Sequence, residues 1–330
     1  MKKVGVIGGG AWGTALAQAA AHADLDTVLW ALEDDVVRDI NTDHMNHTFL
    51  ADIPLHHNIF ATNDIAELAS VDFVLMVCPA QFMRSVATDL KAHLDDNVPL
   101  VICAKGIEKT TGYLMSEVLK EVVPKNPIAV LSGPTFAHEV AKNLPSAVTI
   151  AAEDIEIAKG LSHAIGRPEF RPYWSDDVIG AQIGGSVKNV LAIACGIISG
   201  MEMGENARAA AITRGLHEMT RFGEMKGARF ETLTGLAGLG DLILTCSSTS
   251  SRNMSLGFAL GQGESIEDIM KNRKTVAEGY HSAGILHEIA SKNGLDMPLA
   301  QAVYEICYEN RDVIDALRGI LNRPFSKETI

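Results

Sequence analysis

The chain has 330 residues, which is enough for two domains that each bury a core of their own. With 47% hydrophobic and 21% charged residues, its composition is that of an ordinary soluble globular protein. A formal net charge of −13 disfavours nucleic acid and anionic membrane surfaces as partners, so an anionic substrate would need a local cationic pocket.

The first half of the chain alternates strand-like and helix-like segments. Short apolar runs bounded by glycine, proline or acidic residues predict buried parallel strands at 4–7, 27–30, 73–77, 100–104, 129–131 and 147–151. Between most of them, the apolar spacing predicts helices at 14–23, 85–91 and 111–122. This alternation predicts an α/β Rossmann-type doubly wound sheet, which we assign to a dinucleotide-binding domain of residues 1–180.

After about residue 178 the apolar spacing becomes helical and strand signals largely vanish. Residues 171–177 are expected to be the last extended segment. Helices are then predicted at 207–226, 255–260, 265–272, 283–293 and 300–308, with joints that contain glycine. We therefore predict an all-α C-terminal domain of residues 181–330 that carries the substrate and catalytic groups.

A glycine-rich turn joins the first predicted strand to the first predicted helix. Residues 8–13 read Gly-Gly-Gly-Ala-Trp-Gly, which is G-x-G-x-x-G in the strand–turn–helix context that dinucleotide binding requires. We expect Gly8 to allow the tight turn, Gly10 to let backbone N–H groups approach a pyrophosphate, and Gly13 to let the helix pack close to the sheet. The phosphate charge would then lie at the helix N-terminus.

Acidic residues follow the second predicted strand. Glu33 lies twenty residues after Gly13, where a carboxylate can bind the ribose 2′-hydroxyl and repel a 2′-phosphate, which favours NAD over NADP. The alternative is that Glu33 and its acidic neighbours cap the next helix. Trp12 in the glycine turn also has two interpretations, because its ring can either pack against the domain or contact the cofactor.

Three charged residues lie in apolar segments, where an unpaired charge is unfavourable. Lys188 is on the predicted helix 178–198, which is apolar or small almost throughout and should be buried nearly all round. Lys105 follows a strand, and Asp241 follows a glycine-rich run. Because burial shifts pKa values, such groups are candidates for proton transfer. For each one alone, a structural salt bridge or a snorkelling side chain is the alternative.

Two polar loops suit an oxygen-rich, anionic substrate. Residues 132–137, Ser-Gly-Pro-Thr-Phe-Ala, follow a strand at the sheet edge where ligands bind in open α/β folds. An ordinary strand-to-helix turn would have the same sequence features. Residues 245–253 are dense in hydroxyls and end in Arg252-Asn253, whose donors are matched to phosphate. The alternative for this second segment is a polar surface loop.

Taken together and in order, these motifs resemble those of a known enzyme family. The N-terminal fingerprint is followed by Ala-Lys-Gly at 104–106, Ser-Gly-Pro-Thr-Phe-Ala at 132–137 and Gly-Ser-Val-Lys-Asn at 185–189. Next come Gly-Leu-Gly-Asp-Leu at 238–242, Ser-Arg-Asn at 251–253 and Val-Ala-Glu-Gly-Tyr at 276–280. From residue 4 to about residue 310, the chain resembles bacterial NAD(P)-dependent sn-glycerol-3-phosphate dehydrogenase.

That resemblance implies interconversion of sn-glycerol 3-phosphate and dihydroxyacetone phosphate with NAD or NADP, which supplies glycerol 3-phosphate for phospholipid synthesis. It implies a homodimer in which Lys188 accepts and donates the proton. The implied substrate contacts are Lys105, Gly133, Thr135, Lys188, Asp241, Ser251, Arg252 and Asn253. The implied cofactor contacts are Ala11, Trp12, Lys105, Ala137, Arg252, Val276 and Glu278. Many family members carry a basic residue after the second strand, where this chain has Leu32-Glu33, and this departure again favours NAD.

Histidines and cysteines form no recognisable metal or disulfide framework in the sequence. The histidines of the polar segment 44–57 lack the spacing of a zinc site, so we expect surface-loop histidines and no metal. The five cysteines are scattered without a C-x-x-C pair, which indicates buried thiols in a reducing compartment. No uninterrupted apolar run approaches the ~20 residues that span a bilayer. We therefore predict a cytoplasmic protein without membrane insertion.

Two rival functions fit parts of the sequence. One is another Rossmann dehydrogenase with a helical second domain, in which Arg252 would bind the carboxylate of a hydroxy acid. The other is a non-catalytic NAD(H) sensor. The joint presence of Lys105, Lys188, Asp241 and Arg252 disfavours the sensor, because a protein that only binds the dinucleotide has no need for all four charges.

Overall fold

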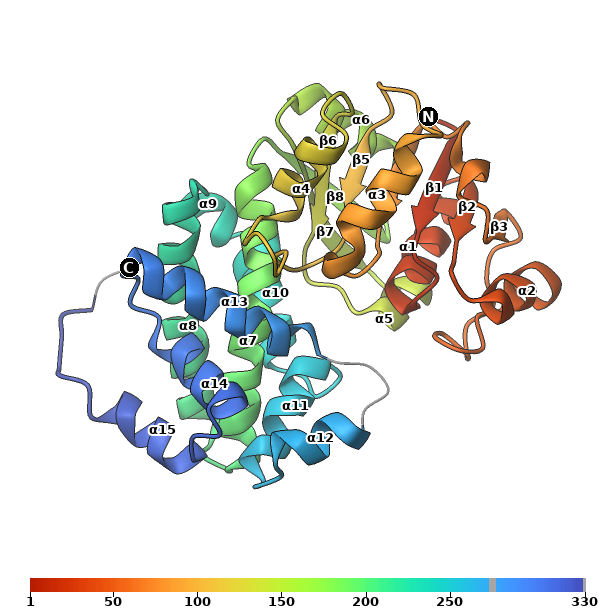
Figure 1. Ribbon diagram of the computed structural model, residues 1–330. Coiled ribbons are helices and arrows are strands. Elements are labelled where there is room, and N and C mark those ends of the chain that lie inside the picture. The colour runs from red at the N-terminus through yellow and green to blue at the C-terminus, as the bar shows by residue number, and fades with distance from the viewer. Residues whose placement is uncertain (273–276, 329–330) are drawn as a thin grey trace. The chain divides into compact units, whose positions relative to one another are not determined.

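The computed structural model describes residues 1–272 and 277–328, and this part of the chain forms two compact units (Figure 1). Unit 1 comprises Met1–Glu108 and Tyr113–Gln182. Unit 2 comprises Lys109–Gly112 and the described residues from Ile183 onward. Buried apolar side chains occur in both units, so each has a hydrophobic core.

An eight-stranded sheet forms the centre of unit 1, with the strand order β3-β2-β1-β4-β5-β6-β7-β8. The strands are β1 (Lys3–Ile7), β2 (Asp26–Trp30), β3 (Ile59–Thr62), β4 (Phe73–Met76), β5 (Leu100–Ile102), β6 (Ile128–Ser132), β7 (Ser146–Ala152) and β8 (Phe170–Ser175). The strands β1 to β6 are all parallel to one another. Their order, 3-2-1-4-5-6, is that of a Rossmann sheet, which confirms the predicted fold class.

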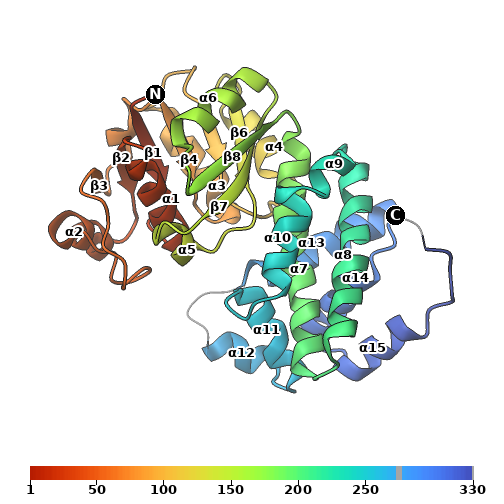
Figure 2. The ribbon, with the colours of Figure 1, turned by 180° about the vertical axis from the view of Figure 1, so that it is seen from behind.

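Helices cover both faces of this sheet. They are α1 (Ala11–His22), α2 (Asp34–Asp43), α3 (Met83–Lys91), α4 (Met115–Val122), α5 (Ala137–Ala141) and α6 (Ile155–Ile165), with the 3₁₀ turns η1 (Ile65–Leu68) and η2 (Ala80–Phe82). Alternate strand residues such as Val4 and Val6 share one face, where they pack with buried residues of α1, α2, α5 and α6. Helices α3 and α4 pack on each other and lie in front of the strands in Figure 1, whereas α6 lies in front in Figure 2.

The strand predicted at 147–151 is present as β7, but the prediction that it is parallel to the preceding strand is wrong, because β7 runs antiparallel to β6. The connection between them holds only the five-residue helix α5. Such a helix is about 7–8 Å long and cannot carry the chain back along a strand of about 16 Å. The chain therefore enters β7 from the end at which β6 finishes. Helix α6 then leads into β8, which is parallel to β7.

Other differences from the predicted elements concern short segments. The sequence does not predict β3, an edge strand with an exposed Phe60. The extended segment predicted at 171–177 is the other edge strand, β8, and its Pro172 is tolerated because one side of an edge strand has no ladder partner. The helix predicted from residue 111 begins only at Met115, since Gly112 has a φ of +72° that an α-helix cannot contain.

All the regular elements among the described residues of unit 2 are helices, as predicted for the C-terminal domain. Its helices are α7 (Val178–Gly200), α8 (Glu205–Lys226), α9 (Phe230–Leu233), α10 (Asp241–Cys246), α11 (Arg252–Gly261), α12 (Ile266–Asn272), α13 (Glu278–Asn293), α14 (Pro298–Tyr308) and α15 (Val313–Leu321), with a π-helical turn η3 (Leu236–Gly240). Helix α14 packs on α8, α13 and α15, and α11 packs on α10, α12 and α13.

The long helix α7 begins in unit 1 and continues through unit 2, where it runs beside α8 (Figures 1 and 2). In the described part of the chain, it is the one helix that is long and apolar enough to cross a membrane by length and composition alone. The most apolar part of α7 is 83% buried inside the protein. A core helix buried on nearly all sides has the same composition, and this burial confirms the sequence prediction for 178–198.

Candidate active site

The glycine-rich turn between β1 and α1 has the geometry that its sequence predicts. Gly8 has a φ of +123°, which favours glycine, and its N–H donates to the Trp30 carbonyl on β2 at 2.9 Å. A Cβ on Gly13 would lie 1.8 Å from the Gly8 carbonyl oxygen, so α1 can start this close to β1 only with glycine there. A Cβ on Gly10, the N-cap of α1, would meet nothing within 4 Å. An anion in that open space would face the N–H groups of the first helical turn, which begins at Ala11.

Trp12 and Glu33 differ in the contacts that their side chains make within unit 1. The indole N–H of Trp12 donates to the Cys103 carbonyl oxygen at 3.3 Å, and its half-buried ring packs against the core of unit 1. Glu33 is the N-cap residue of α2, but its exposed side chain makes no capping hydrogen bond. The Trp12 side chain therefore packs within unit 1, as one of its two interpretations predicts. The Glu33 carboxylate does not cap α2, which was the alternative to ribose binding.

Lys105 and the loop after β6 meet at the carboxyl ends of two neighbouring strands. Lys105 Nζ donates to the Gly133 carbonyl oxygen at 3.4 Å, and the Thr135 hydroxyl donates to the same oxygen at 3.2 Å. Gly133 has a φ of +155°, and a Cβ there would lie 2.9 Å from Val148 Cα, so the loop requires glycine. Ala137, the first residue of α5, is partly buried against the core. The fold therefore brings together three of the predicted substrate residues within unit 1.

In unit 2, Lys188 on α7 forms an ion pair with Asp241, the first residue of α10. Lys188 is 5% exposed and Asp241 is 0% exposed, so the ammonium does not snorkel to solvent. Lys188 Nζ also donates to Thr245 Oγ1 at 2.8 Å. Two of the three charges that the sequence places in apolar segments are thus partners of each other, as buried charges must be.

Thr245 is a site residue that sequence reasoning misses. The sequence suggests a hydroxyl-rich loop from this position, whereas helix α10 continues to Cys246. The available signal is the spacing of four between Asp241 and Thr245, because residues four apart share one face of a helix. A lysine that approaches this face can bond to both side chains at once.

Glycines allow the close backbone packing that brings α7 and α10 together. A Cβ on Gly184 would lie 2.0 Å from the Ala237 carbonyl oxygen in η3. Gly184 lies one turn before Lys188 on α7, and η3 ends just before Asp241. The two backbones therefore approach within reach of the lysine side chain. A π-helical turn such as η3 is frequent at functional sites.

Residues 251–253 begin helix α11 and play three different parts in the fold. Ser251 Oγ accepts a hydrogen bond from the backbone N–H three residues later and so caps the helix. Arg252 is exposed, and Asn253 is buried. The Asn253 amide donates to Asn189 Oδ1 at 3.0 Å, and its Oδ1 accepts from the Gly279 N–H at 2.9 Å. Asn253 therefore links α11 to α7 and to the start of α13.

This link connects three segments that carry predicted site residues. Asn189 follows Lys188 on α7, and Gly279 follows the half-buried Glu278, the first residue of α13. The predicted cofactor residue Val276 lies outside the described residues. The Asn253 side chain thus links the N-terminal ends of α11 and α13, where Arg252 and Glu278 lie, to the helix that carries Lys188.

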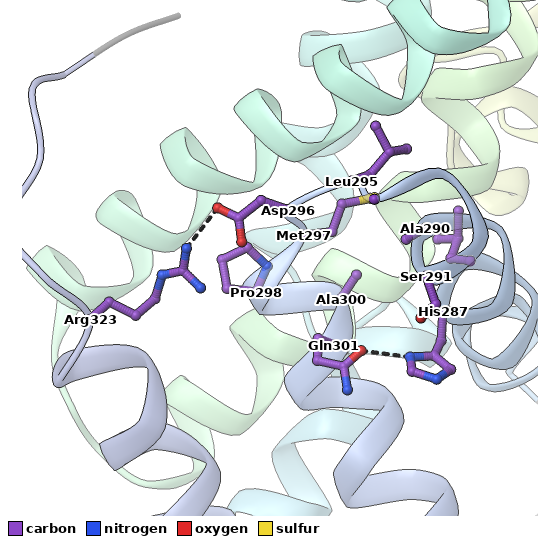
Figure 3. Close-up of a pocket in the computed structure, with 12 residues that line it drawn as sticks. His287, Ala290, Ser291, Leu295, Asp296, Met297, Pro298, Ala300, Gln301 and Arg323 are labelled. Atoms are coloured by element: carbon purple, nitrogen blue, oxygen red, sulfur yellow. Dashed lines mark hydrogen bonds and ion pairs between the residues drawn. The ribbon is translucent and has the colours of Figure 1, made fainter.

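Two hollows in the described part of unit 2 do not contain the site residues. The smaller, of about 190 Å³, lies by α13 and α14, where Asp296 pairs with Arg323 at 2.7 Å and His287 bonds to Gln301 at 2.6 Å (Figure 3). The larger, of about 830 Å³, is lined by residues of α7, α8, α14, α15 and the segment after α15. Neither is lined by Lys188, Asp241 or residues 251–253. The predicted site residues of unit 2 therefore lie outside both hollows.

Histidines and cysteines add no further site to the described chain. His44, His47 and His57 are exposed and His56 is half-buried. Among the described residues, no group of three or more His, Cys, Asp or Glu could hold a metal ion. All five cysteines are buried, as predicted, and none of these described residues forms a disulfide.

A Rossmann sheet with a G-x-G-x-x-G turn, and a helical unit with a buried Lys188–Asp241 pair, together define a dinucleotide-dependent dehydrogenase. A family model described as the NAD-dependent glycerol-3-phosphate dehydrogenase N-terminus matches residues 3–158. The model of the C-terminus of the same family matches residues 177–318. The chain therefore belongs to the NAD-dependent glycerol-3-phosphate dehydrogenase family.

Similar proteins agree with this assignment over nearly the whole chain. The glycerol-3-phosphate dehydrogenase (NAD(P)+) of Parvibaculum lavamentivorans is 55% identical over 328 residues, which are 99% of this chain and 98% of the relative. That of Erythrobacter litoralis is 52% identical over 326 residues, with the same coverage of 99% and 98%. The crystal structure of glycerol-3-phosphate dehydrogenase from Coxiella burnetii has a TM-score of 0.93 at 38% identity, and the match covers 98% of this chain and 99% of that one.

Proposed function

We propose that this chain catalyses the NAD(P)-dependent interconversion of sn-glycerol 3-phosphate and dihydroxyacetone phosphate, with Lys188 as the group that gives and takes the proton. The observation that carries the proposal is the buried ammonium of Lys188, held by Asp241 and Thr245. Membership of the family supplies the reaction. The nicotinamide, when bound, supplies or accepts the hydride at the carbinol carbon of the substrate.

Lys188 acts at the oxygen of that carbon. During reduction, negative charge develops on the carbonyl oxygen, and the ammonium stabilises this charge before it donates the proton. During oxidation, the neutral amine accepts the proton of the hydroxyl group. Asp241 and Thr245 hold Nζ in place, because each accepts a hydrogen bond from it. Both partners are buried, so water does not compete strongly for these bonds.

The phosphate of the substrate is assigned to the N-terminus of α11. The exposed guanidinium of Arg252 offers planar donors matched to phosphate, and the start of a helix favours an anion. Ser251 and Asn253 flank Arg252 and complete the anchor. Lys105, Gly133 and Thr135 are assigned as the substrate contacts of unit 1. Binding energy from the phosphate then helps to hold the carbinol carbon in its reacting position.

The cofactor is assigned to the glycine-rich turn and to the other residues that the sequence predicts as cofactor contacts. Gly8, Gly10 and Gly13 shape the turn, with Ala11 and Trp12 beside the pyrophosphate. The exposed Glu33 carboxylate meets the adenosine ribose and favours NAD, because it would repel a 2′-phosphate. The remaining cofactor contacts that we assign are Lys105, Ala137, Arg252, Val276 and Glu278.

In the cell, we infer a cytoplasmic homodimer that supplies glycerol 3-phosphate for phospholipid synthesis. Five buried thiols suit a reducing compartment, which supports the cytoplasmic assignment. The homodimer rests on the family resemblance. Sedimentation equilibrium of the purified chain tests it, and a monomer at micromolar concentration would contradict it.

The reaction is tested by following NADH and NADPH oxidation with dihydroxyacetone phosphate and, as the matched control, with dihydroxyacetone. We expect oxidation that depends on the phosphate group and is lost in Lys188→Ala, while this variant still binds NADH. Arg252→Ala should lose most of the preference for the phosphorylated substrate. No oxidation with either cofactor would overturn the proposal and leave the hydroxy-acid dehydrogenase and the NAD(H) sensor as alternatives.

A further inference from the structure

An ion pair between the partly exposed Arg84 and the buried Glu108 holds the loop that carries Lys105. Glu108, three residues after Lys105, is 5% exposed. Arg84 on α3 donates from Nε to Glu108 Oε1 at 2.8 Å and from Nη2 to Glu108 Oε2 at 3.0 Å, which is a bidentate pairing. The third guanidinium nitrogen, Nη1, lies 2.7 Å from Glu121 Oε2 on α4, and Glu121 is exposed. Arg84 therefore has one buried and one exposed carboxylate partner.

Other contacts hold the residues between Lys105 and Glu108 against the turn η2. Gln81 Nε2 donates to the Ile107 carbonyl oxygen at 2.8 Å. A Cβ on Gly106 would lie 2.8 Å from Ala80 Cβ, which shows how closely the loop approaches η2. The loop backbone is thus fixed on the side of α3, and its path from β5 to Glu108 has little freedom.

The position of the Lys105 ammonium depends on where this backbone lies, because the lysine stem begins there. One contact of this ammonium is the Gly133 carbonyl oxygen, at 3.4 Å from Nζ. The Arg84 side chain is 35% exposed, and an ion pair that is partly open to solvent adds little net stability, because water screens the attraction. Its bidentate geometry, however, defines where the loop lies. The pair is therefore better suited to fixing a position than to stabilising the fold.

We propose that Arg84 and Glu108 are positioning residues that set where the Lys105 ammonium meets the phosphorylated substrate. The proposal rests on the function proposed above for Lys105. Neither Arg84 nor Glu108 is assigned a contact with substrate or cofactor. A displacement of about 1 Å at a reacting group can lower a rate by about 100-fold, so loss of the bidentate geometry alone should impair turnover.

A double-mutant cycle with Lys105 tests the proposal. Arg84→Lys keeps the positive charge but loses the planar fork, and we expect kcat/KM for dihydroxyacetone phosphate to fall about tenfold or more. In a Lys105→Ala background, the same substitution should change kcat/KM by less than about twofold, because the positioned group is gone. Glu121→Gln is the matched control, since it removes the exposed partner of the same arginine, and it should stay within about twofold of the wild type.

The cycle separates positioning from a general loss of structure. Equal losses of kcat/KM in both backgrounds would mean that Arg84 acts through stability alone and would overturn the proposal. Thermal unfolding of each variant checks the fold, and Glu108→Gln, which keeps the side-chain volume, repeats the cycle if Arg84→Lys does not fold. Wild-type turnover in Lys105→Ala would also overturn the proposal. That result would leave the assignment of Lys188 intact, because Lys188→Ala tests it independently.

Discussion

The two units prepare their site residues in different ways. In unit 1 the site depends on backbone conformation, since Gly8 and Gly133 have positive φ values and Lys105 lies on a loop after β5. In unit 2 it depends on helix packing, because Lys188 and Asp241 meet in the core between α7 and α10. Local conformation can be lost without unfolding, whereas a buried pair cannot be broken without a cost to stability. Substitutions at the unit 1 site should therefore change binding with little loss of stability, whereas substitutions at the buried pair of unit 2 should lower both turnover and stability.

The largest effect is expected where the buried pair of unit 2 is broken. Lys188→Met should lower turnover by about 10²–10⁴-fold through loss of proton transfer. It should also lower the free energy of unfolding by about 3–5 kcal/mol, because Asp241 remains buried without its lysine. The double variant Lys188→Met/Asp241→Leu should regain much of this stability but none of the turnover. Urea unfolding and initial rates measure the two properties, and a double variant no more stable than Lys188→Met would contradict this account.

Two glycines of unit 1 should separate stability from cofactor binding. Gly13→Ala should lower the free energy of unfolding by about 1–3 kcal/mol, since its Cβ would lie 1.8 Å from the Gly8 carbonyl oxygen. Gly10→Ala meets nothing within 4 Å and should leave stability unchanged, but its methyl group enters the space assigned to the pyrophosphate. We expect weaker NADH binding in a fluorescence titration of Gly10→Ala. Unchanged affinity would remove Gly10 from the assigned cofactor site.

A second buried charge makes the stability of unit 2 depend on pH. Glu218 on α8 is 1% exposed, and its carboxylate accepts the N–H groups of Leu299 at 2.7 Å and Ala300 at 3.0 Å in the first turn of α14. Burial raises the pKa of Glu218 from 4.5 to about 7, although these backbone bonds and Arg221 oppose the rise. Because the folded state holds the proton more tightly, this group stabilises the fold below pH 4.5, and that contribution is lost as pH rises through about 7.

Glu218→Gln should remove this dependence. Between pH 5 and 8, as the proton leaves Glu218, the free energy of unfolding of the wild type should fall relative to that of the variant by about 1–3 kcal/mol. Urea unfolding at several pH values measures the difference. Parallel curves for the two proteins would mean that the carboxyl group titrates normally in the folded state.

The smallest effect is expected at Glu33 in unit 1. Glu33→Ser removes an exposed carboxylate that makes no capping hydrogen bond, so stability should not change. The ratio of kcat/KM for NADPH to that for NADH should rise about fivefold to tenfold, which corresponds to ~1 kcal/mol of charge repulsion. Asp34→Ser, in the first turn of the same helix, is the matched control. Equal shifts in the two variants would indicate a general charge effect rather than a contact of Glu33 with the ribose.

Features that depend on neighbouring residues could be predicted from the sequence. The G-x-G-x-x-G turn, the buried helix around Lys188 and the alternation of strands and helices could all be predicted. Glycine spacing sets backbone conformation locally, and apolar periodicity sets which face of an element is buried. For the same reason, Lys188 and Asp241 could be identified as charges in need of partners.

The partners of these charges could not be predicted, because they come from distant parts of the chain. Lys188 pairs with Asp241 and Thr245 more than fifty positions away, and Glu218 caps a helix that starts eighty residues later. The antiparallel course of β7 likewise depended on a short connection that the strand pattern does not reveal. The local sequence pattern indicates that a buried charge needs a partner and that a strand needs a neighbouring strand. Which distant group becomes that partner depends on how the helices and strands pack, since the contact forms only after those elements have come together.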